Sequence, residues 1–130
     1  MLIRTGYSFR VAYGFLEDVM ARIETPYAPI TDRASMFGHN PWRKLCEENG
    51  KRPIYGVEIG VTDNFGAKKP AVGHAVLLAG DSLELINQAF SVATAQFRYQ
   101  PLLTYHDLAS LPASCHVLLG RGLDIAALPD

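Results

Sequence analysis

The sequence predicts an α/β fold with a largely parallel sheet of about five strands. Apolar runs of strand length alternate with amphipathic segments of helix length, which is typical of this class. From Ala28 to Val61, with a break at Gly50–Pro53, the pattern indicates a strand–helix–strand crossover, and such crossovers make neighbouring strands parallel. The 130 residues suit one domain, 1–130. Because an eight-unit α/β barrel takes about 250 residues, only a partial barrel is expected.

The front half of the chain is expected to hold three strands and two helices. The expected strands are Met1–Thr5, a run that ends at Thr31-Asp32, and Ile54–Val61. Apolar residues between Tyr13 and Glu24 recur at spacings of three and four, which predicts an amphipathic helix. A second helix is expected from Asn40, as its N-cap, with Pro41 in the first helical position. Gly50 supplies its C-terminal stop.

The back half is expected to add two strands and a longer helix. The strands are predicted at Gly73–Ala79 and His116–Leu119, the first after a long polar loop over 62–72. Asp81 and Ser82 offer N-cap oxygens to a helix that runs to about Gln96. Residues 97–103 are expected to be irregular.

Composition excludes some classes of function. The formal net charge is −1 with 19% charged residues, so no electrostatic footprint for unaided nucleic-acid binding is indicated. No secretory signal and no apolar run of about 18 residues is found, so no membrane contact and a cytoplasmic location are expected. Cys46 and Cys115 have neither metal-knuckle spacing nor a disulfide pattern, and both are expected to be reduced.

Two carboxylates indicate a possible chemical site. Asp32 and Glu58 lie near the carboxyl ends of neighbouring parallel strands and could open onto the same face. Two converging carboxylates would suggest a metal or phosphoester site. His74, at the start of a strand, is by itself more typical of a structural residue than of a ligand. His39 lies before the expected cap and is more typical of a surface or capping residue.

Several motifs occur in an order that resembles a known family. They are Thr5-Gly6-Tyr7-Ser8, Thr31-Asp32, Met36-Phe37-Gly38, Arg52-Pro53-Ile54-Tyr55-Gly56-Val57-Glu58 and His74 to Ala79, with a looser match at Ser114 to Gly120. Together they resemble the front half of the polymerase and histidinol phosphatase (PHP) domain of bacterial and phage DNA polymerase III alpha subunits. The resemblance covers roughly the whole chain. It implies a partial PHP-like (βα) barrel and a short helical segment within 102–111.

The resemblance also implies a degenerate metal site. Positions where the family carries metal-binding histidines are occupied by Leu2, Arg4 and Arg33. Leucine has no lone pair, and a guanidinium is always protonated, so none of the three can bind a cation. The implied vestigial metal positions are Asp32, Glu58 and His74, with Arg4 and Arg33 replacing the charge of the metal and Ser8, Cys115 and His116 as further pocket residues.

Three functions follow from these observations. The first is a metal-free, cofactor-free and non-catalytic module of DNA replication, whose partner is a DNA polymerase alpha-type subunit or a second copy of the chain. A phage or mobile element that encodes its polymerase in pieces would place it in the host cytoplasm. The alternative is a metal-dependent phosphoesterase or 3′–5′ exonuclease that uses Asp32, Glu58 and His74 with Zn²⁺ or Mn²⁺. The third is a binding protein that reuses the fold outside replication.

Overall fold

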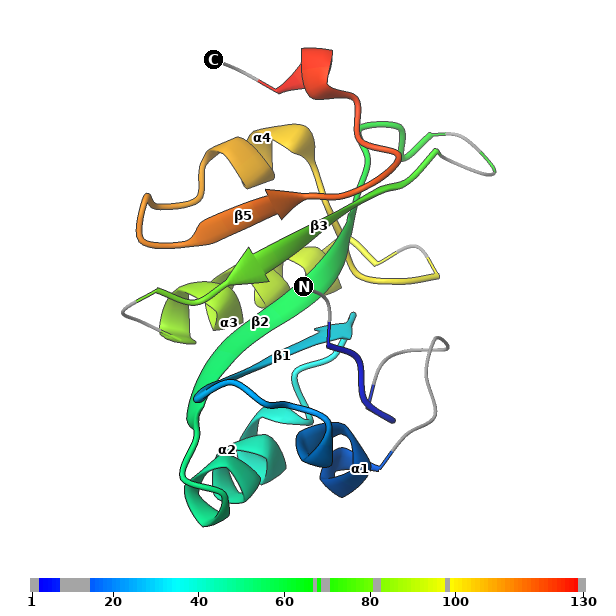
Figure 1. Ribbon diagram of the computed structural model, residues 1–130. Helices are drawn as coiled ribbons and strands as arrows, with labels where there is room; N and C mark the ends of the chain where they lie inside the picture. The colour runs from blue at the N-terminus through cyan, green and yellow to red at the C-terminus, as the bar shows by residue number, and fades with distance from the viewer. Residues whose placement is uncertain are drawn as a thin grey trace. The chain divides into compact units, whose positions relative to one another are not determined.

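The computed structural model describes residues 3–7, 15–66, 68, 71–80, 83–97 and 99–128 (Figure 1). The strands are β1 (Tyr27–Arg33), β2 (Arg52–Val61), β3 (Gly73–Leu78), β4 (Leu102–Leu103) and β5 (His116–Leu119). The helices are α1 (Leu16–Ala21), α2 (His39–Glu48), α3 (Leu83–Ala95), α4 (Tyr105–Ala109) and the 3-10 helix η1 (Ile125–Ala127).

The predicted α/β class and the five strands are confirmed, and the five strands belong to one sheet. The sheet is mixed rather than largely parallel, because β1–β2 and β2–β4 pair in parallel whereas β3–β5 pair antiparallel. The chain forms two compact units, Met1–Glu58 and Ile59–Asp130, and β2 contributes residues to both. None of the helices in the described part of the chain is both long and apolar enough to cross a bilayer.

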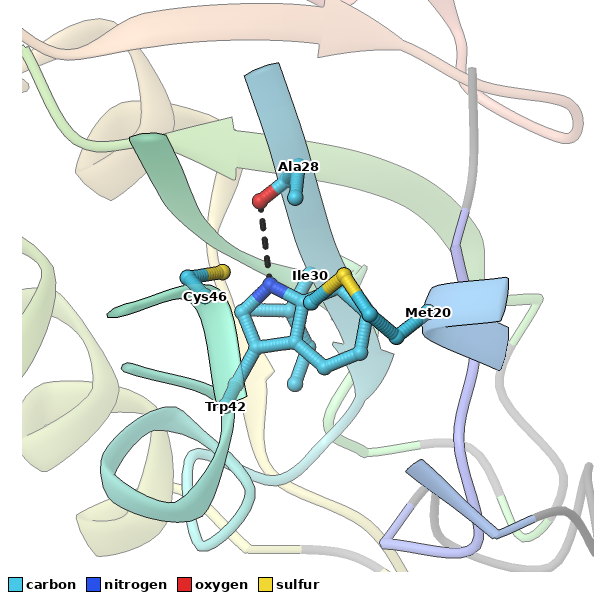
Figure 2. Close-up of a cluster of buried hydrophobic side chains, with 5 residues drawn as sticks. All are labelled: Met20, Ala28, Ile30, Trp42 and Cys46. Atoms are coloured by element: carbon cyan, nitrogen blue, oxygen red, sulfur yellow. Dashed lines mark hydrogen bonds between the residues drawn. The ribbon is translucent and has the colours of Figure 1, made fainter. Parts of the chain in front are cut away.

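The first unit is built on the β1–α2–β2 crossover. Its two strands run in parallel with Tyr27 opposite Arg52 and Arg33 opposite Glu58. One apolar cluster holds α1 and α2 against β1, and Figure 2 shows its members, Met20, Ala28, Ile30, Trp42 and Cys46. The Trp42 ring is fully buried, and its Nε1–H donates to the Ala28 carbonyl over 3.0 Å. The crossover predicted from the sequence is therefore confirmed.

Three boundaries in this unit differ from the prediction. α1 ends at Ala21 rather than Glu24, because the next amides bond back over three residues, as in Ile23 N–H to Met20 carbonyl. The N-cap of α2 is Gly38 rather than Asn40, so the helix begins at His39, and the Gly38 carbonyl accepts the Trp42 amide. Residues 3–5 form no regular strand, because the amide of Ile3 donates to a side chain, the Thr31 hydroxyl, instead of to a carbonyl.

In the second unit the end of β2 pairs with β4, at Gly60 opposite Leu102. The two-residue strand β4 lies where an irregular segment was expected. Thr104 then caps α4 in a capping box with Asp107, in which each side chain accepts from the backbone amide of the other. The predicted strand His116–Leu119 is confirmed as β5, and the predicted long helix is confirmed from Leu83. Its proposed caps, Asp81 and Ser82, lie outside the described residues.

Two glycines allow the backbone of this unit to pack closely beside the β3–β5 pair. A Cβ atom on Gly80 would lie 2.0 Å from the Ser114 carbonyl oxygen. A Cβ atom on Gly120 would lie 2.4 Å from the His74 carbonyl oxygen, which already accepts the Gly120 amide over 2.9 Å. Both positions therefore require a residue without a side chain.

Candidate functional site

An N-terminal segment, residues 3–7, lies along β1 and carries donors toward both candidate carboxylates (Figure 1). Its backbone is held by the Thr31 amide, which donates to the Ile3 carbonyl over 2.9 Å. The Thr31 hydroxyl accepts the Ile3 amide over 2.8 Å. This short contact fixes the position of the next two residues, Arg4 and Thr5, beside the parallel strands.

Asp32 is fully buried and is bound by Thr5. The Thr5 hydroxyl donates to Oδ2 of Asp32 over 2.7 Å, and the Thr5 amide donates to Oδ1. The backbone at Gly38 approaches from the start of α2, where a Cβ atom would lie 3.0 Å from Oδ2 of Asp32. Both carboxylate oxygens therefore accept hydrogen bonds from the protein, which offsets the cost of burying this polar group.

Glu58 is also buried, and its partner is Arg4. The Arg4 guanidinium donates through Nε over 3.0 Å and through Nη2 over 2.6 Å, both to Oε2 of Glu58. Arg33 lies directly opposite Glu58 in the strand register. Since opposed residues of paired strands point to the same face, Arg33 and Glu58 share one face of the β1–β2 pair.

The register also shows that Asp32 and Glu58 do not share a face, contrary to the expectation from the sequence. Asp32 is opposite Val57, one residue before Glu58, and successive side chains of a strand point to opposite faces. Asp32 alternates with Ala28 and Ile30 on the face that packs on α2, whereas Glu58 is on the other face. A one-residue offset thus separates Asp32, near the end of β1, from Glu58, at the neighbouring level of β2.

This arrangement gives each carboxylate its own protein donors. The described residues contain no group of three histidine, cysteine or carboxylate side chains that could hold a metal ion. On the Glu58 face, the guanidinium of Arg4 pairs with the carboxylate, and Arg33 lies opposite Glu58 in the strand register. Chemically, the site is a buried carboxylate paired with a partly exposed arginine.

The other predicted site residues lie in the second unit or outside the described chain. Leu2 and Ser8 are among the residues that the structure does not describe. His74 is the second residue of β3, and its amide donates to the Arg121 carbonyl over 3.1 Å. His116 is opposite Leu78, at the other end of β3, so four residues, or about 13 Å of strand, separate it from the level of His74. Cys115 is buried beside His116, and burial raises the pKa of its thiol. The structure therefore does not gather His74, Cys115 and His116 into one pocket.

His39 is the residue whose role the sequence did not indicate. It is the first residue of α2 and is buried rather than on the surface. Its Nε2 donates to the Gly56 carbonyl on β2 over 2.9 Å, and its ring lies 5.3 Å from that of Tyr55. Burial lowers the pKa of His39 below 6.5, and the Gly56 hydrogen bond and Asp32 oppose this shift. With the N-cap expected at Asn40, His39 falls in a loop, and the sequence pattern carries no signal for its burial.

The face of the β1–β2 pair that carries Arg33 and Glu58, with Arg4 bound to Glu58, is called the charged face below. Its function has to be inferred from its own chemistry. Comparison of the sequence with models of known protein families and with curated proteins found no match. The first unit presents one arginine–glutamate pair on the face that does not pack on α2, and one buried aspartate behind it.

Proposed function

We propose that this chain is a metal-free, non-catalytic module of the PHP type that serves DNA replication as a structural or interaction part of a DNA polymerase III-type alpha subunit. The observation that carries the proposal is the ion pair between Arg4 and Glu58. The motif order of the sequence assigns Arg4 and Glu58 to positions of a metal cluster, and here a protein cation already pairs with the carboxylate.

The positive charge of the Arg4 guanidinium argues against the binding of a divalent ion at Glu58. A guanidinium about 4 Å from a carboxylate attracts it by roughly 4 kcal/mol at an effective dielectric constant near 20. A metal ion that binds Glu58 would have to displace Arg4, and it would then meet the repulsion of Arg4 and of Arg33 across the register. We also propose that the sheet of this chain is part of a partial (βα) barrel of the PHP type.

An interaction role is supported by aromatic side chains on the surface of the first unit. Phe37, just before α2, is 83% exposed, and Phe15, the N-cap residue of α1, is 78% exposed. Exposed aromatic residues are enriched at the centres of protein interfaces. The expected partner is a DNA polymerase alpha-type subunit, with a second copy of the chain as the alternative.

The first experiment tests whether the chain binds a metal ion or hydrolyses phosphoesters. Protein purified without chelator should hold far less than one equivalent of zinc, manganese or iron by elemental analysis. It should not hydrolyse a nitrophenyl phosphate ester or the 3′ end of single-stranded DNA when Zn²⁺ or Mn²⁺ is added. About one ion per chain, lost in Glu58→Ala or Asp32→Ala, would contradict the proposal and favour the phosphoesterase.

The second experiment tests the partner. The chain should bind a DNA polymerase alpha-type subunit from the same genome in analytical ultracentrifugation, and Phe37→Ser should weaken that complex at least tenfold. Phe97→Ser is a matched control, because Phe97 is a 54% exposed phenylalanine in the second unit. Formation of a homodimer without binding to the polymerase subunit would support the second-copy alternative. A chain that stays monomeric and does not bind the polymerase subunit would refute an interaction role.

A further inference from the structure

His39 joins the first turn of α2 to β2 through one side-chain hydrogen bond. The Gly56 carbonyl is the acceptor, 2.9 Å from Nε2. A carbonyl oxygen only accepts, so Nε2 must carry the proton. In the neutral ring Nδ1 then has a lone pair and no hydrogen.

That second nitrogen has no hydrogen-bond partner among the described residues, and it is buried. An unpaired acceptor of this kind is tolerated at a modest cost. Protonation would instead place a positive charge and an unpaired N–H group in the same buried position, which is far more costly. The geometry therefore accommodates the neutral ring and has no acceptor ready for the charged ring.

The charged and titratable neighbours do not remove this penalty. On β1, Asp32 favours the charged ring, yet both of its oxygens already accept from Thr5. On β2, Tyr55 contacts the ring, and burial raises the pKa of its hydroxyl, so Tyr55 is neutral throughout the relevant range. On α2 itself, Arg43 is exposed and donates to Glu47 and Asn40.

We propose that His39 is a pH-sensitive latch, which in its neutral form holds the start of α2 on β2 and on protonation releases it. The released segment would include Phe37 and Gly38, which precede the helix, and would loosen the docking of Trp42 one turn later. The inference rests on the contacts of His39 alone and does not depend on the proposed function.

The direction of the pH effect follows from linkage. The folded protein binds the His39 proton more weakly than the unfolded chain does, because its pKa lies below 6.5. Above about pH 7 both states have a neutral ring, so this group gives no pH dependence. As the pH falls through about 6.5 the unfolded chain takes up the proton first, and the folding equilibrium constant decreases by at most about tenfold per pH unit for one proton.

The test compares urea unfolding of the wild type, His39→Gln and His116→Gln between pH 8 and pH 5. Glutamine can keep a donor toward Gly56 and does not titrate. The ratio of the wild-type folding constant to that of His39→Gln should be constant above pH 7 and should fall steadily below pH 6.5. His116 is exposed, so its glutamine variant should keep the wild-type profile. Equal pH profiles for the wild type and His39→Gln would overturn the latch.

Two further measurements keep the proposal testable if His39→Gln does not fold. Trp42 is the single tryptophan of the chain, and its emission in the wild type should shift to the red between pH 7 and pH 5 without urea. Nitrogen-15 NMR of the imidazoles should show His39 as the neutral tautomer with the proton on Nε2 at pH 6.5. A His39 ring that is mostly protonated in the folded protein at that pH would contradict the proposal.

Discussion

Arg4 donates two hydrogen bonds to a single carboxylate oxygen of Glu58, a residue 54 positions further along the chain. The pair links the N-terminal segment to β2, although that segment bonds its backbone to β1. The side chain of Arg4 is 32% exposed and that of Glu58 only 7% exposed. Water can therefore solvate the Arg4 guanidinium in part, whereas the Glu58 carboxylate has little access to water and needs the arginine as its partner.

Removal of Arg4 should accordingly destabilise the first unit. We expect Arg4→Met to lower the free energy of unfolding by about 1.5–3 kcal/mol, the range for losing hydrogen bonds to a charged group that remains buried. The measurement is urea unfolding at neutral pH. Arg43→Met is the control, because the Arg43–Glu47 pair is exposed and should be worth no more than about 0.5 kcal/mol. Equal effects of the two variants would show that Glu58 has other means of stabilisation.

Thr5 provides a second, independent test of the N-terminal segment. Thr5→Val keeps the shape and the backbone amide but removes the hydroxyl that donates to the fully buried Asp32. The expected loss in the free energy of unfolding is about 1–3 kcal/mol. Thr25→Val removes an exposed hydroxyl that donates to the Tyr27 carbonyl, and it should change stability by less than about 0.5 kcal/mol. If Thr5→Val has the same free energy of unfolding as the wild type, the hydrogen bond from the backbone amide of residue 5 is enough to stabilise the buried Asp32.

Arginine-to-histidine changes should convert the charged face into a better metal site. With Arg4→His and Arg33→His together, Glu58 loses its cationic partner and gains two imidazoles nearby. We expect binding of Zn²⁺ by isothermal titration calorimetry in the double variant and none in the wild type. Adding Glu58→Gln to the double variant is the control, and it should abolish the binding. No heat in either protein would show that the geometry of the face cannot bind a metal ion.

Both cysteines should be chemically inert in the folded protein. Cys46 and Cys115 are buried, and burial raises the pKa of each thiol, so the reactive thiolate is depleted at neutral pH. We expect reaction with a disulfide reagent to be slow in the native state and rapid in urea. The rate should rise as the pH increases toward 9. Rapid labelling of either cysteine at pH 7 without urea would indicate that its surroundings open readily.

The sequence predicted the parts of this fold that depend on local pattern. The crossover from β1 through α2 to β2 was recognised because apolar periodicity and the break at Gly50 are encoded within a few residues. The direction of β5 was not, because an apolar run of four residues has the same appearance in parallel and antiparallel pairs. The two residues of β4 are too few to give any period.

The sequence singled out Arg4, Asp32 and Glu58 as candidate residues, but it did not give the geometry in which they lie. The structure pairs Arg4 with Glu58, and the replacement of a metal's charge by Arg4 stays a prediction. The separation of Asp32 from Glu58 onto two faces depends on a register offset of one residue, and local sequence pattern does not give the register between two strands. The burial of His39 depends on a helix that starts at His39 itself, after the N-cap Gly38, where no capping side chain marks the position in the sequence.

The close backbone approaches at Gly80 and Gly120 have a consequence for how this sequence can diverge. Any side chain at either position would collide with a carbonyl oxygen that is itself part of the backbone, so no neighbouring rotamer could relieve the clash. Gly66, whose added Cβ atom would meet nothing within 4 Å, is under no such constraint. In sequences that share this ancestry, we expect glycine to be retained at 80 and 120 and to drift at 66. That contrast would identify distant relatives even after the charged face has changed.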